Sequence, residues 1–221
     1  MSGLPDVSAL LVGILGGTGD QGRGLARRLA LAGQRVLIGS RDASRAAAAA
    51  TSLGVSGVDG AANADAAVRS DVVIVAVPWD GHRALMESLP ASLSAKIVVD
   101  CVNPLGFDKQ GAFAVDVPEG SAAQQAAALL PDARVVAAFH HVSSVLLLDP
   151  TIERVEQDVL VLGDDRDATD TVQSLAGRIP GMRGVYAGRL RNARQVEALA
   201  ANLISVNRRY KAHAGLRVAG V

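Results

Sequence analysis

The chain has 221 residues, of which 49% are hydrophobic and 3% aromatic, and its 22 basic residues balance 22 acidic ones. This length is enough for one large domain with a full core. The even charge gives no electrostatic reason to expect nucleic acid or an anionic membrane surface as a partner. The single cysteine, Cys101, excludes an internal disulfide and a cysteine-cluster metal site, and its apolar neighbours predict a buried structural thiol.

The start of the chain has no basic segment before an apolar stretch, and the longest apolar runs have only the length of strands. We therefore expect no membrane-spanning segment and a cytoplasmic protein. No internal repeat and no disordered linker divides the sequence.

The first predicted strand, at about residues 10–15, leads into a glycine-rich turn and a helix that ends near Gly33. Gly17, Gly19 and Gly22 have the G-x-G-x-x-G spacing, in which the glycines allow a tight turn, close approach of a pyrophosphate and close helix packing. The start of the helix offers free N–H groups and the positive end of its dipole to an anion. A plain strand-to-helix turn can also be rich in glycine, but the strand before and the amphipathic helix after it favour a dinucleotide site.

The second predicted strand, Arg35–Gly39, indicates which dinucleotide is bound. Enzymes that use NAD usually place a carboxylate near its end, where it accepts a hydrogen bond from the ribose 2′-hydroxyl. This chain has Ser40 and Arg41 there and Arg45 one helical turn later. A hydroxyl and two guanidiniums can donate to a 2′-phosphate, with roughly 1.5–3 kcal/mol for each charge-assisted hydrogen bond. NADP is therefore favoured over NAD, the alternative being that both arginines are merely solvated surface residues.

Strands and helices alternate as far as residue 142. Asp42 is a predicted N-cap of a helix that ends near Leu53. Further strands are expected near residues 55–58, 71–77, 96–102 and 134–139, further helices near 61–68, 81–89 and 121–130, and a loop at 105–120. The run at 71–77 is almost entirely apolar and β-branched, which is typical of a parallel sheet covered on both faces. The alternation predicts an α/β fold with a doubly wound, Rossmann-type parallel sheet.

A smaller α/β segment follows a boundary near Val142. It is expected to contain strands at 158–163 and 182–186, a helix at 167–179 and a long last helix at 190–208. We therefore predict a dinucleotide-binding domain at residues 1–142 and a C-terminal segment at 143–221 that completes the substrate crevice. The last helix carries a wide apolar stripe that either joins the core or contacts a second subunit. The stripe consists of Val196, Leu199, Ala200, Leu203 and Ile204.

The ligand crevice of a doubly wound sheet lies at the carboxyl ends of its strands. Three loops should therefore face the glycine turn, and we expect them to hold the nicotinamide and the second substrate. They are Val77–His82, Asn103–Pro104 and His140–Ser143. Simpler structural interpretations remain open: Trp79 as a lid on the core, His82 as a solvated residue and Asn103 as a turn cap.

The adjacent His140 and His141 do not predict a metal site. If the strand continues to them, their side chains point to opposite faces, and no carboxylate or second cysteine lies nearby in the sequence. We expect one histidine to contact a substrate and the other to be structural.

Several motifs together resemble the NADPH-dependent reductases of coenzyme F420, also called F420H2:NADP oxidoreductases. The resemblance covers nearly the whole chain, and its most specific part is the Gly-Gly-Thr-Gly turn followed by Ser40-Arg41. The other matching stretches are Val77-Pro78-Trp79, Asn103-Pro104 and Phe139-His140-His141-Val142-Ser143, the last of which differs in some members of the family. The resemblance implies NADP and coenzyme F420 as cofactors and a homodimer in which the last helix has an interface role.

The resemblance also implies site residues, in four groups. The 2′-phosphate would be held by Thr18, Ser40, Arg41 and Arg45. The pyrophosphate would lie at Gly19 and Gln21, and the cofactor-binding turn around them also includes Gly17, Asp20 and Gly22. The nicotinamide would lie beside Val77, Pro78, Asn103 and Pro104. The deazaflavin pocket would be lined by Trp79, His82 and His140.

The implied reaction is direct hydride transfer between the deazaflavin and the nicotinamide, which depends on proximity and alignment. No nucleophile–base pair and no carboxylate pair stands out in the crevice loops, so we predict no catalytic acid or base. Two other functions remain open. One is an NADPH reductase of an imine, a carbonyl, a flavin or a metal chelate, with His82, His140 or His141 as proton donor. The other is a non-catalytic NADP-binding sensor.

Overall fold

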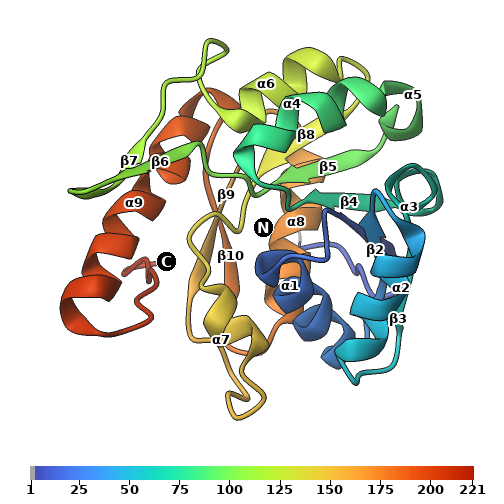
Figure 1. Cartoon of the computed structure of the whole chain (residues 1–221), viewed down its shortest axis with the longest axis horizontal. Coiled ribbons are helices and arrows are strands. Elements are labelled where there is room, and N and C mark those ends of the chain that lie inside the picture. The colour runs from blue at the N-terminus through green and yellow to red at the C-terminus, as the bar shows by residue number, and fades with distance from the viewer. Residues whose placement is uncertain (1–2) are drawn as a thin grey trace.

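The computed structural model describes residues 3–221 and contains a central sheet with helices on both faces (Figure 1). The strands are β1 Leu11–Leu15, β2 Arg35–Ser40, β3 Val58–Ala62, β4 Val72–Val75, β5 Ile97–Asp100, β6 Leu105–Asp108, β7 Gly111–Ala114, β8 Arg134–Ala137, β9 Asp158–Gly163 and β10 Arg183–Gly188. The helices are α1 Asp20–Leu31, α2 Ala43–Ser52, α3 Asn63–Arg69, α4 Trp79–Ser88, α5 Pro90–Leu93, α6 Ala122–Leu129, α7 Ser144–Leu148, α8 Arg166–Arg178, a 3-10 turn at Leu190–Asn192 and α9 Ala193–Tyr210.

The central sheet has eight strands in the order β10-β9-β8-β5-β4-β1-β2-β3. Every neighbouring pair is parallel except β8 and β9, which run antiparallel. The chain winds outward from β1 in both directions, so the carboxyl ends of β1, β2, β4, β5 and β8 meet at one edge. The predicted α/β, Rossmann-type fold is confirmed.

Two apolar layers fix this arrangement. The layer on one face joins Leu25 and Leu29 of α1 to Val172 and Leu175 of α8. The layer on the other face joins α3, α4 and α6 to the start of α9, with Met86 of α4 fully buried in it. The inner strands of the sheet, β1, β2, β4, β5, β8 and β9, are mainly apolar and buried on both sides, as a parallel sheet requires, whereas the edge strands β3 and β10 are more exposed.

Most predicted elements are present, but four details differ. β3 begins at Val58, after the expected strand at 55–58, and α4 begins at Trp79, earlier than the expected Gly81. The expected loop at 105–120 contains the hairpin of β6 and β7, in which the carboxylate of Asp108 accepts hydrogen bonds from two turn N–H groups. The short helices α5 and α7 were not predicted, and Arg28 of α1 secures α7 by donating to the carbonyl oxygens of Leu146 and Leu147.

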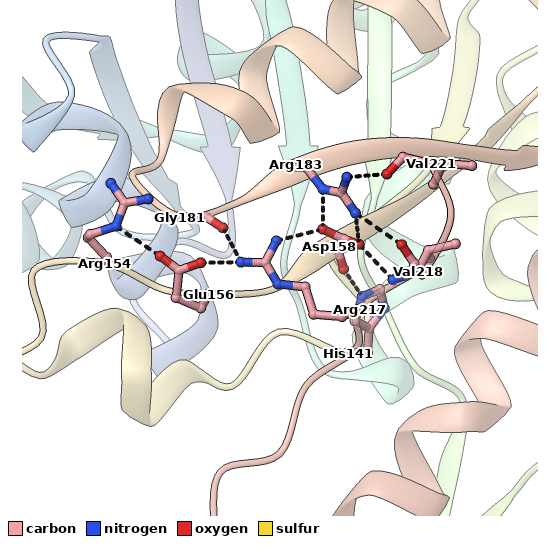
Figure 2. Close-up of polar contacts among 9 residues, drawn as sticks. All are labelled: His141, Arg154, Glu156, Asp158, Gly181, Arg183, Arg217, Val218 and Val221. Carbon is pink, nitrogen blue, oxygen red and sulfur yellow. Dashed lines mark hydrogen bonds and ion pairs between the residues drawn. The ribbon is translucent and has the colours of Figure 1, made fainter.

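The segment after residue 142 extends the same sheet, because β9 pairs with β8. Figure 2 shows how the last residues of the chain attach to it. Asp158, at the start of β9, has a fully buried carboxylate that accepts hydrogen bonds from Arg183, Arg217 and the Val218 N–H. Hydrogen bonds from Arg183 hold the pKa of this carboxyl well below its usual range. The backbone oxygen of Asp158 lies 2.7 Å from Nε2 of His141, so the same residue also anchors the loop after β8.

No helix among residues 3–221 is long and apolar enough to cross a membrane.

Candidate functional site

The turn between β1 and α1 has the geometry of a phosphate cradle. Gly16 has φ +69°, a conformation that glycine adopts without strain. A Cβ atom added to Gly17 would lie 2.7 Å from the Ile14 oxygen, and one added to Gly22 would lie 2.5 Å from Cα of Gly17. Gly19 is different, because its nearest neighbour would be 3.9 Å away and the residue is exposed. The turn is therefore closely packed at Gly17 and Gly22 and open at Gly19, where a pyrophosphate would approach.

The first turn of α1 faces this open side. Its N-cap is Gly19, in extended conformation, and no side chain within residues 3–221 caps it. The first N–H groups of the helix thus remain free to donate to an anion. Gln21 in the same turn donates from Nε2 to the Phe139 oxygen at 3.4 Å, which links the cradle to the loop after β8. Thr18 is half-buried and Asp20 is exposed.

Backbone and side-chain hydrogen bonds attach the cradle to the end of β2. The Gly17 N–H donates to the Gly39 oxygen at 3.0 Å, and the Gly16 N–H donates to Oδ1 of Asn63 at 3.4 Å. These contacts fix the glycine turn relative to Ser40, the residue after Gly39. Sequence reasoning missed Asn63, because an asparagine at the start of a helix belongs to no motif and becomes relevant only when β3 pairs with β2.

The residues expected to hold the 2′-phosphate lie together at the end of β2. Ser40 is buried, and its Oγ accepts from the Asp42 N–H at 3.3 Å. Arg41 and Arg45 are exposed, and neither forms an ion pair with the residues that the structure describes. Asp42 caps α2 as predicted, accepting from the Ser44 and Arg45 N–H groups. Hydrogen bonds from Ser44 lower the pKa of Asp42. The end of β2 thus carries two exposed cations without an ion pair among the described residues and one buried hydroxyl.

The loop after β4 lies against the cradle. A Cβ atom on Gly16 would meet Cγ1 of Val77 at 2.3 Å, so the valine side chain packs directly on the glycine turn. Pro78 is exposed and stands just before α4. Trp79 is half-buried on the apolar layer of that face, and its ring centroid lies 5.5 Å from that of His82.

The loops after β5 and β8 meet beside it. Nδ2 of Asn103 donates to the His140 oxygen at 2.8 Å, and Pro104 is buried next in the chain. Oδ1 of Asn103 and both ring nitrogens of His140 are buried without a partner among the described residues. Burial lowers the pKa of His140 to about 4, so its ring is neutral at pH 7. Buried polar atoms normally have partners, and a polar ligand here would supply them.

His141 has the structural role expected for one histidine of the pair. Its ring is buried, and Nε2 donates to the Asp158 oxygen at 2.7 Å. The preceding Phe139 is fully buried with φ +63°, which turns the chain sharply after β8. The buried structural thiol is also confirmed: Cys101 contacts the Val75 oxygen through Sγ at 3.0 Å, and burial raises its pKa.

His82 is fully buried, so the interpretation of it as a solvated residue is wrong. Its Nε2 lies 2.6 Å from Oδ2 of Asp100 and its Nδ1 lies 3.0 Å from Oε1 of Gln125. The ring consequently presents no free polar atom to a ligand. No local pattern predicts this arrangement, because its three members come from α4, β5 and α6 and only the fold brings them together.

The sheet order, the glycine cradle and the crevice loops define the class of dinucleotide-binding oxidoreductases. Residues 11–104 match the family described as NADP oxidoreductase, coenzyme F420-dependent. The chain is 40% identical to the F420-dependent NADP reductase of Methanothermobacter thermautotrophicus, over 96% of each chain. It is 37% identical to that of Methanocaldococcus jannaschii, over 94% of this chain and 97% of the relative.

A similar fold is found in a crystal structure from Arthrobacter sp. FB24, provisionally assigned as an F420-dependent NADP reductase. It is 27% identical, with a TM-score of 0.83 over 96% of this chain and 100% of that one. The chain belongs to the family of F420-dependent NADP oxidoreductases.

Proposed function

We propose that the chain transfers a hydride between NADP(H) and the deazaflavin coenzyme F420 in the crevice at the carboxyl edge of the sheet. Family membership supports the reaction. The observation that carries the placement of NADP is the cradle, which is open above Gly19 and hydrogen-bonded to the end of β2. The deazaflavin then occupies the crevice beyond the nicotinamide.

NADP is held at two anionic points. The pyrophosphate accepts hydrogen bonds from backbone N–H groups of the turn at residues 17–22, with Gln21 beside it. The 2′-phosphate accepts from Ser40, Arg41 and Arg45, with Thr18 at the same end. A free hydroxyl and two unpaired guanidiniums suit a phosphate dianion, and a carboxylate would repel it.

The reacting rings occupy the other end of the crevice. Val77, Pro78, Asn103 and Pro104 lie beside the nicotinamide, and Trp79 and His140 lie on the deazaflavin side. The unpartnered Oδ1 of Asn103 and ring nitrogens of His140 form hydrogen bonds with polar groups on the edges of the nicotinamide and deazaflavin rings. The bound cofactors supply the hydride chemistry, and the chain orients them and excludes water. His140, neutral at pH 7, adds no charge at the point of transfer.

A direct assay tests the proposal. The purified protein is mixed with NADPH and oxidised F420 without oxygen, and the absorbance of the deazaflavin is followed. We expect catalytic loss of that absorbance. Consumption of NADPH only with an imine, a small carbonyl, free flavin or a ferric chelate would make the chain a different reductase. Tight NADPH binding without turnover of any acceptor would make it a sensor.

We also propose that the protein is a cytoplasmic homodimer. Large apolar side chains are exposed on α9 and on the neighbouring hairpin, namely Phe107, Phe113, Ile204, Val206 and Tyr210. Exposed apolar patches of this kind are typical of subunit interfaces. Light scattering should give twice the chain mass, and Phe107→Glu should reduce it to that of a monomer. An unchanged mass in the variant would remove the hairpin from the interface.

A further inference from the structure

A series of hydrogen-bonded polar side chains runs from the surface into the interior of the protein. Arg83 pairs with Glu119, and Oε2 of Glu119 accepts from Nε2 of Gln125 at 3.0 Å. Oε1 of Gln125 lies 3.0 Å from Nδ1 of His82, whose Nε2 lies 2.6 Å from Oδ2 of Asp100. The side chains of His82 and Asp100 have no exposed surface. Burying such a pair costs desolvation free energy, so the groups that the pair contacts indicate its role.

The hydrogen bonds determine the charge of His82. Gln125 donates its amide hydrogen to Glu119, so its oxygen faces the ring, and the carboxylate of Asp100 can only accept. Both ring nitrogens therefore face acceptors, an arrangement that is fully hydrogen-bonded only when the ring is protonated as an imidazolium. Burial alone would lower the pKa of His82, but the hydrogen bond and charge of Asp100, together with Gln125, outweigh it and raise this pKa.

The imidazolium contacts two of the loops that form the crevice. On one side it lies 5.5 Å from the ring of Trp79, within the range of a cation–π interaction of about 6 Å. On the other side it holds Asp100, whose second oxygen accepts from the Val102 N–H at 3.0 Å. Val102 leads directly into Asn103 and Pro104. One buried cation thus connects the loop after β4 with the loop after β5.

We propose that His82, as a cation paired with Asp100, is a positioning residue that holds Trp79 and the Asn103–Pro104 loop in the alignment needed for hydride transfer. The inference rests on the proposed function. His82 touches no reacting atom and takes up no proton during the reaction. Its effect is geometric, because hydride transfer is sensitive to small misplacements of the two rings.

Two further titratable groups face the pair. Glu197 of α9 accepts hydrogen bonds from the first two N–H groups of α6, and burial raises its pKa to about 7. As Glu197 ionises above that pH, its negative charge adds to that of Asp100 and favours the cation further. His140 also feels Asp100 but is neutral.

The test compares His82→Gln and Asp100→Asn with His213→Gln, which alters an exposed histidine outside the crevice. Nitrogen NMR of the wild-type protein at pH 8 should show both ring nitrogens of His82 protonated. In single-turnover experiments, hydride transfer should slow by about tenfold or more in the first two variants. Their KM for NADPH should change less than about threefold, because the arginines at the β2 end are untouched. His213→Gln should behave as wild type.

Gln125 offers a graded version of the test. Gln125→Glu keeps an acceptor for Nδ1 and should transfer hydride faster than Gln125→Leu, which removes it. A neutral His82 ring at pH 8 would overturn the proposal. So would unchanged transfer rates in variants whose melting temperature alone falls, since that is the result of a purely structural role.

Failure of the proposed function can be distinguished from failure of this inference. If wild-type protein does not turn over F420, the function is wrong, and the role of His82 is then judged from NMR and Trp79 emission. Trp79 is the chain's single tryptophan. The change in its emission on NADPH binding should differ between wild type and Asp100→Asn, and an identical change would overturn the positioning role.

Discussion

At the β2 end of the crevice the charged groups, Arg41 and Arg45, are exposed and unpaired within the described part of the chain, whereas at the β5 and β8 end His82, Asp100 and His140 are buried. Water screens the exposed charges until a phosphate displaces it, so this end can select a ligand by charge at little cost to folding. The charged groups of the buried end, His82 and Asp100, must be paired before a ligand arrives, because an unpaired buried charge would destabilise the fold. In the proposed function, one end selects by charge and the other by fixed geometry.

The largest effect is expected from a variant that disrupts the glycine cradle, which lies between the two ends of the crevice. In Gly22→Ala the new Cβ would meet Cα of Gly17 at 2.5 Å, and backbone cannot move aside cheaply. We expect NADPH affinity to fall about a hundredfold, as measured by calorimetry. Gly177→Ala is the matched control, because this helical glycine of α8 has nothing within 4 Å of its added Cβ. Equal affinities in both variants would show that the cradle does not bind the pyrophosphate.

The exposed end is tested by replacing both arginines with alanine. Arg41→Ala/Arg45→Ala should raise the KM for NADPH by about 10–100-fold, the loss of one to two exposed charge-assisted hydrogen bonds. The KM for NADH should change less than twofold. Arg35→Ala, at the opposite end of the same strand, controls for a general loss of positive charge. Equal effects on both dinucleotides would mean that no 2′-phosphate lies here.

The buried end is tested through the pH dependence of stability. The pKa of His140 is about 4 in the folded chain and about 6.5 when unfolded, so folding favours the neutral ring. The contribution of this pKa difference to the free energy of unfolding is complete above pH 6.5 and is lost as the pH falls toward 4. Between pH 7 and pH 5 the free energy of unfolding falls by about 2 kcal/mol for this reason.

Urea denaturation at both pH values measures this loss. His140→Asn should reduce the difference between the two unfolding free energies by about 2 kcal/mol. His213→Gln, at an exposed position, should leave the difference as it is in wild type. An unaltered difference in His140→Asn would show that His140 is not kept neutral by burial.

The smallest effect concerns the cap that orders the exposed end. Asp42→Ala removes the acceptor for the Ser44 and Arg45 N–H groups and should lower the free energy of unfolding by about 1 kcal/mol. Asp42→Asn should restore most of this, because an amide oxygen also caps. Equal stability of all three proteins would contradict the capping role.

The same contrast explains what the sequence could predict. The glycine spacing, Ser40-Arg41 and the Asp42 cap depend on residues close together in the chain. Their local patterns correctly predicted the tight glycine turn and the helix cap, while the ligands assigned to them stay predictions. The interactions of Asp100 with His82 and of His141 with Asp158 join residues 18 and 17 positions apart on different elements. No local pattern encodes such pairs. The hairpin of β6 and β7 was missed because each strand has only four residues and two of these are exposed.

The antiparallel step from β8 to β9 has a consequence for anyone who wishes to retarget the enzyme. Because β9 runs the other way, its amino end at Asp158 lies on the side of His141, and the turn that follows it points to the far edge of the sheet. A mutant library for new acceptors should therefore sample the loops after β4, β5 and β8 and the segment that enters β9. Diversity placed after β9 would lie at the opposite edge of the sheet, away from the proposed crevice.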